Sequence, residues 1–175
     1  MELKEMVDHF KHEREAIAAG TPLGLLPPHL LCFRGEDAVC SVMAPQSTAW
    51  AISALMAAIP ITKPSRVFMA VEALIGAAHD PSSGRALCVL QSDVDGSPVE
   101  SETHPYSVAD DGSLEWKPEL DPLPVVGMLS DAIYEMFGFN VKNSAQDLMM
   151  WFQINGFAAR IAPVILLGTD DGAQS

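Results

Sequence analysis

Residues 66–98 read RVFMAVEALIGAAHDPSSGRALCVLQSDVDGSP, and this stretch decides the fold class. Its two apolar runs, RVFMAVEALIGA and RALCVLQS, are rich in residues that favour strands. Between them, HDPSSG has the Asp-Pro pair and the glycine of a chain reversal, and DVDGSP after them supplies the Asp-Gly pair of a tight turn. Because short loops join only antiparallel neighbours, the stretch predicts a meander of hairpins.

Strands on both sides extend this meander. Residues 29–45, HLLCFRGEDAVCSVMAP, predict a hairpin that turns around Gly35. Residues 99–108 are expected to form a more polar strand, and residues 114–118 a short last strand after the turn ADDGS. The sheet is therefore expected to contain mostly antiparallel neighbours.

Helices are expected before, within and after these strands. Residues 1–20 place apolar side chains at helical spacing along one stripe, between charged residues. Residues 46–60, QSTAWAISALMAAIP, predict a helix that Ser47 caps and Pro60 ends. Two more helices follow a Pro-rich connector, and Ser144 is expected to cap the second.

The expected fold is α+β, with a mainly antiparallel sheet in the order β-β-α-β-β-β and the N-terminal and two C-terminal helices packed on it. A chain of 175 residues with 49% apolar content suits a single globular domain, which we expect over residues 1–168. Its expected parts are the N-terminal helix at 1–20, the sheet core at 29–117, the helical C-terminal part at 124–168 and a flexible tail at 169–175.

The charge of the chain argues against nucleic acid as a direct partner. The formal net charge of -13 comes from 23 acidic and 10 basic residues, which leaves no stripe of Lys and Arg to neutralise phosphates. We therefore expect no direct binding of nucleic acid. An acidic mimic of nucleic acid is a second alternative function, and it requires carboxylates clustered in a regular row.

Cysteine usage and hydropathy favour a cytoplasmic protein without a membrane span. Cys32, Cys40 and Cys88 form no C-x-x-C motif and leave one cysteine unmatched under any pairing, which favours a reducing compartment. The N-terminus is charged and lacks the apolar core of a secretory signal. Polar residues such as Arg160 interrupt the most apolar segment, residues 148–168, so we expect it to be buried in protein.

Acidic residues at the predicted strand ends allow one alternative activity, a hydrolase that uses Mg²⁺ or Mn²⁺. Glu72 attracts attention because an unpaired carboxylate is costly to bury in an apolar run. A solvent-facing position, or pairing with Arg66 or Arg85, would explain it without a metal, and turn formation would explain the other acids. The candidate ligands are Glu72, Asp93 and Asp95, with His79 or His104.

Other catalytic motifs are weak or absent in the sequence. His9 and His12 form H-x-x-H near Glu13, but a zinc protease would have H-E-x-x-H, and a solvated helix accounts for these residues. The sequence contains no G-x-S-x-G elbow and neither of the two standard glycine-rich phosphate loops. We therefore expect no cofactor and favour a non-enzymatic binding or accessory protein.

The segment after Ser144 predicts an interaction surface. Apolar side chains surround nearly the whole circumference of the expected helix, so a single supporting sheet leaves part of them uncovered. Self-association, as a two-fold dimer, is the functional hypothesis. Coverage by the first helix and the connector after Pro118 is the competing interpretation. The candidate interface residues are Met149, Met150, Trp151, Phe152, Ile154 and Phe157.

Overall fold

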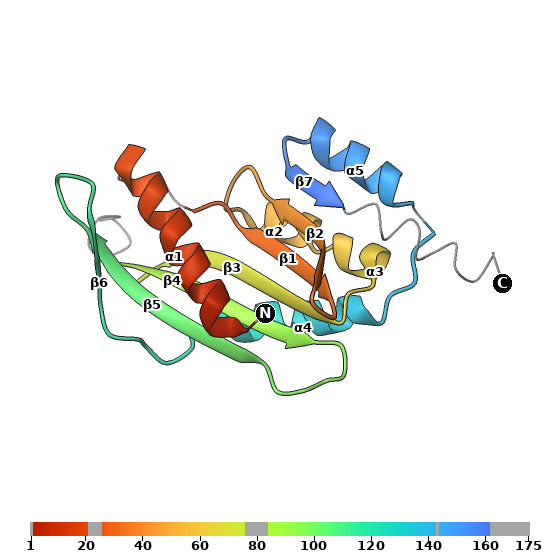
Figure 1. Ribbon diagram of the computed structural model, residues 1–175, viewed down its shortest axis with the longest axis horizontal. Coiled ribbons are helices and arrows are strands. Elements are labelled where there is room, and N and C mark those ends of the chain that lie inside the picture. The colour runs from red at the N-terminus through yellow and green to blue at the C-terminus, as the bar shows by residue number, and fades with distance from the viewer. Residues whose placement is uncertain (1, 21–25, 76–83, 143, 162–175) are drawn as a thin grey trace.

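The computed structural model describes residues 2–20, 26–75, 84–142 and 144–161. These residues form an α+β fold in which helices cover both faces of one seven-stranded sheet (Figure 1). Every strand pair in the sheet is antiparallel, as the sequence predicts. His79 and the expected flexible tail lie outside the described residues.

The sheet has the strand order β6-β5-β4-β3-β1-β2-β7. The predicted hairpin, helical segment and later strands follow one another as expected, but among the described residues four strands follow the helical segment where the predicted order β-β-α-β-β-β has three, and a further strand lies near the C-terminus. The strands are β1 (His29–Arg34), β2 (Asp37–Met43), β3 (Arg66–Leu74), β4 (Arg85–Asp93), β5 (Glu100–Val108), β6 (Leu114–Trp116) and β7 (Ala158–Ile161).

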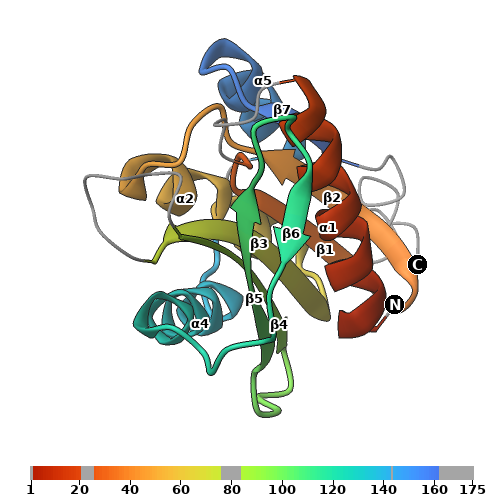
Figure 2. The ribbon, with the colours of Figure 1, turned by 90° about the vertical axis from the view of Figure 1, so that its left-hand side faces the viewer.

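The helices divide between the two faces of the sheet (Figure 2). Among the helices that the structure describes, α1 covers one face, and the other helices lie over the larger core on the opposite face. Within the described residues, no helix is both long and apolar enough to span a membrane. The helices are α1 (Leu3–Gly20), α2 (Ala49–Leu55), α3 (Ala58–Thr62), α4 (Pro124–Phe137) and α5 (Ala145–Ile154).

Helix α1 is held on its face of the sheet by the predicted apolar stripe. Leu3, Val7 and Phe10 recur at helical spacing and are buried. They pack in one cluster with Phe68 of β3 and Leu87 of β4, so α1 crosses the middle of the sheet. Strand alternation then sends the neighbouring side chains of β3 and β4 into the other core.

The predicted helix at 46–60 is instead two short helices, α2 and α3. The N-cap of α2 is Thr48 and not Ser47, because the Thr48 hydroxyl accepts a hydrogen bond from Ala51 N at 3.1 Å. Pro60 lies inside α3 and does not end the element. Its missing N–H costs little there, because the first amides of a helix have no intrahelical partner.

The C-terminal part contains one confirmed cap and one strand that the sequence analysis missed. Ser144 caps α5 by accepting a hydrogen bond from Asp147 N at 3.1 Å, as predicted. Residues 158–161 form β7, which pairs with β2 at the edge of the sheet. Ala158 and Ala159 have low strand propensity, so pairing with β2 decides the conformation of this segment.

We expect Thr48→Ala to lower the free energy of unfolding by about 1 kcal/mol, because it removes the side-chain acceptor at the start of α2. Urea denaturation followed by circular dichroism measures this loss. Ser47→Ala is the matched control and should leave the free energy of unfolding unchanged. Equal losses in the two variants would contradict the assignment of Thr48 as the cap.

Candidate functional site

A buried polar cluster joins α1 to the sheet. The Arg14 Nε atom lies 2.6 Å from Glu72 Oε1, and both side chains are fully buried. Arg14 Nε also donates a hydrogen bond to the Tyr106 hydroxyl at 2.7 Å, and that hydroxyl donates to Glu72 Oε2. Leu26 N donates to Glu72 Oε1 at 2.7 Å. We call Arg14, Glu72 and Tyr106 the anchor cluster.

The electrostatics of the anchor cluster are those of a closed structural site. Burial raises the pKa of Glu72, while the Tyr106 hydrogen bond and the charge of Arg14 oppose the rise. Burial and the neighbouring Glu72 carboxyl raise the pKa of Tyr106 to about 12. Both carboxylate oxygens of Glu72 already accept hydrogen bonds from the protein. The cluster therefore serves packing and gives Glu72 no open position for a metal ion.

The basic partner of Glu72 is one that the sequence analysis missed. Pairing with a basic residue was expected, with Arg66 or Arg85 as the candidate. Arg14 of α1 makes the contact, and Arg85 adds only a favourable charge effect. Arg14 follows Phe10 by four residues and Val7 by seven, which places it on the buried face of α1. That spacing is the signal that could have identified it.

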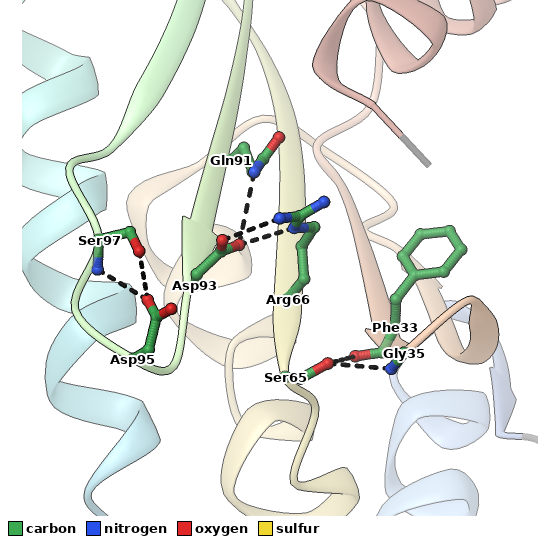
Figure 3. A network of polar contacts seen from close by, with 8 residues as sticks. All are labelled: Phe33, Gly35, Ser65, Arg66, Gln91, Asp93, Asp95 and Ser97. Carbon is green, nitrogen blue, oxygen red and sulfur yellow. Dashed lines mark hydrogen bonds and ion pairs between the residues drawn. The ribbon is translucent and has the colours of Figure 1, made fainter.

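Asp93 and Asp95 lie at the opposite end of β3 and β4 from Glu72. Figure 3 shows Asp93 receiving two hydrogen bonds from Arg66, at 2.7 and 2.9 Å. Asp95 accepts hydrogen bonds from Ser97 N and Oγ in the turn that follows. Arg66 precedes Glu72 by six strand positions, or about 20 Å. The structure does not bring Glu72 together with these acids.

A different group of residues could hold a metal ion. The ligand atoms of Glu102, His104 and Glu119 all lie within 4.8 Å of one another. His104 Nε2 lies 2.9 Å from Glu102 Oε1, at hydrogen-bond distance, so these two side chains already contact each other. Of the sequence-predicted ligands that lie in the described part of the chain, His104 alone belongs to this group. Its carboxylates, Glu102 and Glu119, are not those of the alternative hydrolase, which were Glu72, Asp93 and Asp95.

The predicted interface residues divide between core and surface. Phe152 and Phe157 are buried in the larger core, and Met149 is half-buried. Met150, Trp151 and Ile154 are exposed, by 61%, 41% and 77% respectively. The exposed side chains therefore form a surface on α5, while the buried ones hold that helix on the sheet.

A groove runs beside this surface, between α2 and α5. Its volume is about 690 Å³. Trp50 of α2 is 53% exposed, and its ring centroid lies 5.9 Å from that of Trp151. Trp50 was not among the predicted interface residues, because the sequence analysis placed it in a helix defined by its buried face. We call this the Trp groove; it is lined by Trp50, Ser53, Ala54, Ala57, Asp147, Leu148 and Trp151.

Neither element of the competing interpretation covers the exposed face of α5. Helix α1 lies on the opposite face of the sheet (Figure 2). In the connector after Pro118, Leu120 pairs with Thr103 of β5, at the far side of the sheet from β7. Among the described residues, these two segments therefore leave Met150 and Ile154 open to solvent.

Comparisons with protein families, with curated proteins and with solved structures found no match for this chain. The candidate site therefore rests on the geometry of the chain itself. The Trp groove combines a hollow, two exposed tryptophans and a neighbouring ridge of exposed apolar side chains. Large exposed apolar patches of this kind mark binding surfaces in soluble proteins.

We expect Arg14→Met to lower the free energy of unfolding by about 3–5 kcal/mol, because it leaves Glu72 buried without its cation. Arg66→Met is the matched control, since it removes an arginine from a partly exposed ion pair and should cost about 1 kcal/mol or less. Chemical denaturation measures both losses. Similar losses in the two variants would contradict the anchor role of Arg14.

We expect alkaline pH to weaken the fold through Tyr106. Its pKa is raised from 10 to about 12 in the folded chain, so folding favours the neutral hydroxyl. The stability from this group is complete below pH 10 and is lost as the pH rises from 10 toward 12. Tyr106→Phe should remove this loss of stability, which thermal denaturation measures as a fall in melting temperature between pH 10 and pH 12. Tyr134→Phe, at an exposed position, is the control and should retain it.

Proposed function

We propose that this protein acts as an accessory protein that associates with itself through the Trp groove and the exposed face of α5. The observation that carries the proposal is that the Trp groove lies directly beside a ridge of exposed apolar side chains on α5. Trp151 forms a wall of the hollow, and Met150 and Ile154 project from the same helix into solvent. A two-fold axis near α5 would place the ridge of each copy against the hollow of the other.

A second copy of the chain fits this surface better than a basic partner does. The chain has a net charge of -13, so most of its surface attracts cations and repels another copy. Helices α2 and α5 together contain one charged residue, Asp147. Two acidic copies can approach each other most closely where their surfaces are nearly uncharged.

The side chains at this surface are suited to an interface core. Met and Trp are enriched at the centres of protein interfaces, where they bury large areas with adaptable packing. Trp50 and Trp151 would act as the anchors, since truncation of buried Trp residues is among the most costly changes at interfaces. The side chains of Ser53, Ala54 and Ala57 are small, so they leave room in the groove for a methionine side chain to enter.

We place this dimer in the cytoplasm. Cys32 and Cys40 face each other across β1 and β2 as free, buried thiols. Contact with Cys40 and burial raise the pKa of the Cys32 thiol, which keeps the thiol protonated and weakly reactive. A reducing compartment would maintain such a neighbouring pair in this state.

Analytical ultracentrifugation tests the proposal. We expect a dimer at micromolar concentration, and we expect Met150→Glu and Ile154→Glu to give folded monomers, because each places a charge in the apolar contact. Met128→Glu is the matched control, since Met128 is 72% exposed on α4, and this variant should remain dimeric. Circular dichroism confirms that each variant is folded.

Two results would overturn the proposal. The first is a wild-type chain that stays monomeric at tens of micromolar concentration. The second is a dimer that dissociates with Met128→Glu but persists with both α5 variants. In a Trp116→Phe background Trp50 and Trp151 are the remaining tryptophans, so tryptophan emission should shift to shorter wavelength as the concentration increases and the dimer buries them.

A further inference from the structure

A second hollow lies on the other face of the sheet and is independent of the proposed dimer. It has a volume of about 660 Å³ and lies between α1 and the exposed sides of β1, β2 and β7. Its apolar wall consists of Met6, Leu31, Ala158 and Ala159. The remaining wall carries the polar side chains of His9, Glu13, His29, Ser41 and Arg160, and we call the space the histidine hollow.

A chain of polar contacts crosses this hollow. His29 Nε2 lies 2.9 Å from Ser41 Oγ, and His29 Nδ1 lies 3.7 Å from Glu13 Oε2. The other oxygen of Glu13 lies 3.1 Å from His9 Nε2. The ring of Phe10 packs edge-on against His29 with centroids 5.4 Å apart, which fixes the plane of the imidazole. Ser41, His29 and Glu13 are thus arranged as nucleophile, general base and orienting carboxylate.

Two atoms of this arrangement lack hydrogen-bond partners within the described residues. They are His29 Nδ1 and Glu13 Oε2, which are buried and face each other. His29 as a whole is 6% exposed, so the imidazole is removed from bulk water. A movement of less than 1 Å would close this contact into a hydrogen bond. With that movement, hydrogen bonds would connect Ser41, His29 and Glu13 in one continuous relay.

The charge of Glu13 determines which nitrogen of His29 carries the proton. Contact with His29 lowers the pKa of Glu13, so its carboxyl is ionised at neutral pH. An ionised carboxylate beside Nδ1 favours the tautomer with the proton on Nδ1. The lone pair of Nε2 then accepts a hydrogen bond from the Ser41 hydroxyl. This is the geometry of a serine activated by a general base.

Arg160 adds a positive charge to the wall of the histidine hollow. It is the partner of Ser41 across the β2 and β7 ladder, and it carries the one permanent positive charge among the lining residues. Partners in adjacent strands point to the same face and lie about 5 Å apart. The guanidinium can therefore stabilise negative charge that develops on an oxygen next to Ser41.

We propose that Ser41 is a catalytic nucleophile and that the histidine hollow hydrolyses small acyl esters. The volume and the apolar wall suit a short acyl chain. Ser41 Oγ bonds to the carbonyl carbon while its proton passes to His29 Nε2. The ester C–O bond then breaks, and the departing alcohol takes that proton. Water next attacks the acyl-serine through the same base, which releases the carboxylic acid and restores the Ser41 hydroxyl.

Labelling with a fluorophosphonate tests the proposed nucleophile. The probe forms a P–O bond with an activated serine and loses fluoride, and intact mass and peptide mapping then identify the modified residue. We expect one adduct, on Ser41, and none in Ser41→Ala. His29→Gln and Glu13→Gln should each lower the labelling rate at least tenfold. Ser53→Ala is the matched control at a serine of the Trp groove and should label like wild type.

Hydrolysis of p-nitrophenyl acetate provides an independent readout. Wild type should release p-nitrophenol at least tenfold faster than Ser41→Ala, and circular dichroism checks that both are folded. No adduct on Ser41 in the folded wild-type chain, or labelling undiminished in both relay variants, would overturn the proposal. Met150→Glu should still be labelled, because the histidine hollow lies within one chain; failure of the dimer thus leaves this test intact.

Discussion

The ion pair between Arg14 and Glu72 is the constraint on which the arrangement of this fold depends. Each charge alone would be costly to bury, and together with Tyr106 and the Leu26 amide they satisfy one another. The apolar stripe of α1 could pack on the sheet in several registers. A slip of one helical turn, about 5.4 Å, would separate Arg14 from Glu72 and leave both charges buried without a partner. The anchor cluster therefore selects one position for the helix.

That position also determines the geometry of the histidine hollow. Glu13 immediately precedes Arg14, so the turn of α1 that is held by Glu72 presents Glu13 to His29. Strand alternation supplies the other side, because Ser41 faces α1 while its neighbours Cys40 and Val42 face the larger core. The relay in the hollow thus follows from a helix register that a separate ion pair fixes.

Local patterns in the sequence predict most of the fold and little of the candidate sites. The hairpins and the Ser144 cap depend on neighbouring residues, and they are confirmed. Strand β7 depends on pairing with β2, which lies more than a hundred residues earlier. The Trp groove likewise joins Trp50 to Trp151, and this contact requires the folded sheet. Asp93 and Asp95 were predicted as metal ligands because carboxylates are common ligands. In the structure, Asp93 instead forms an ion pair with Arg66.

Strand β7 connects the two proposed surfaces, because its two faces serve different sites. Ala159 and Ile161 pack against the larger core beneath α5, while Ala158 and Arg160, together with part of Ala159, line the histidine hollow. The small side chain of Ala158 keeps that side of the edge open. Since the Trp groove and the histidine hollow lie on opposite faces of one sheet, a dimer formed through α5 leaves the polar hollow accessible to solvent. The proposed association and the proposed catalysis are therefore compatible in the same chain.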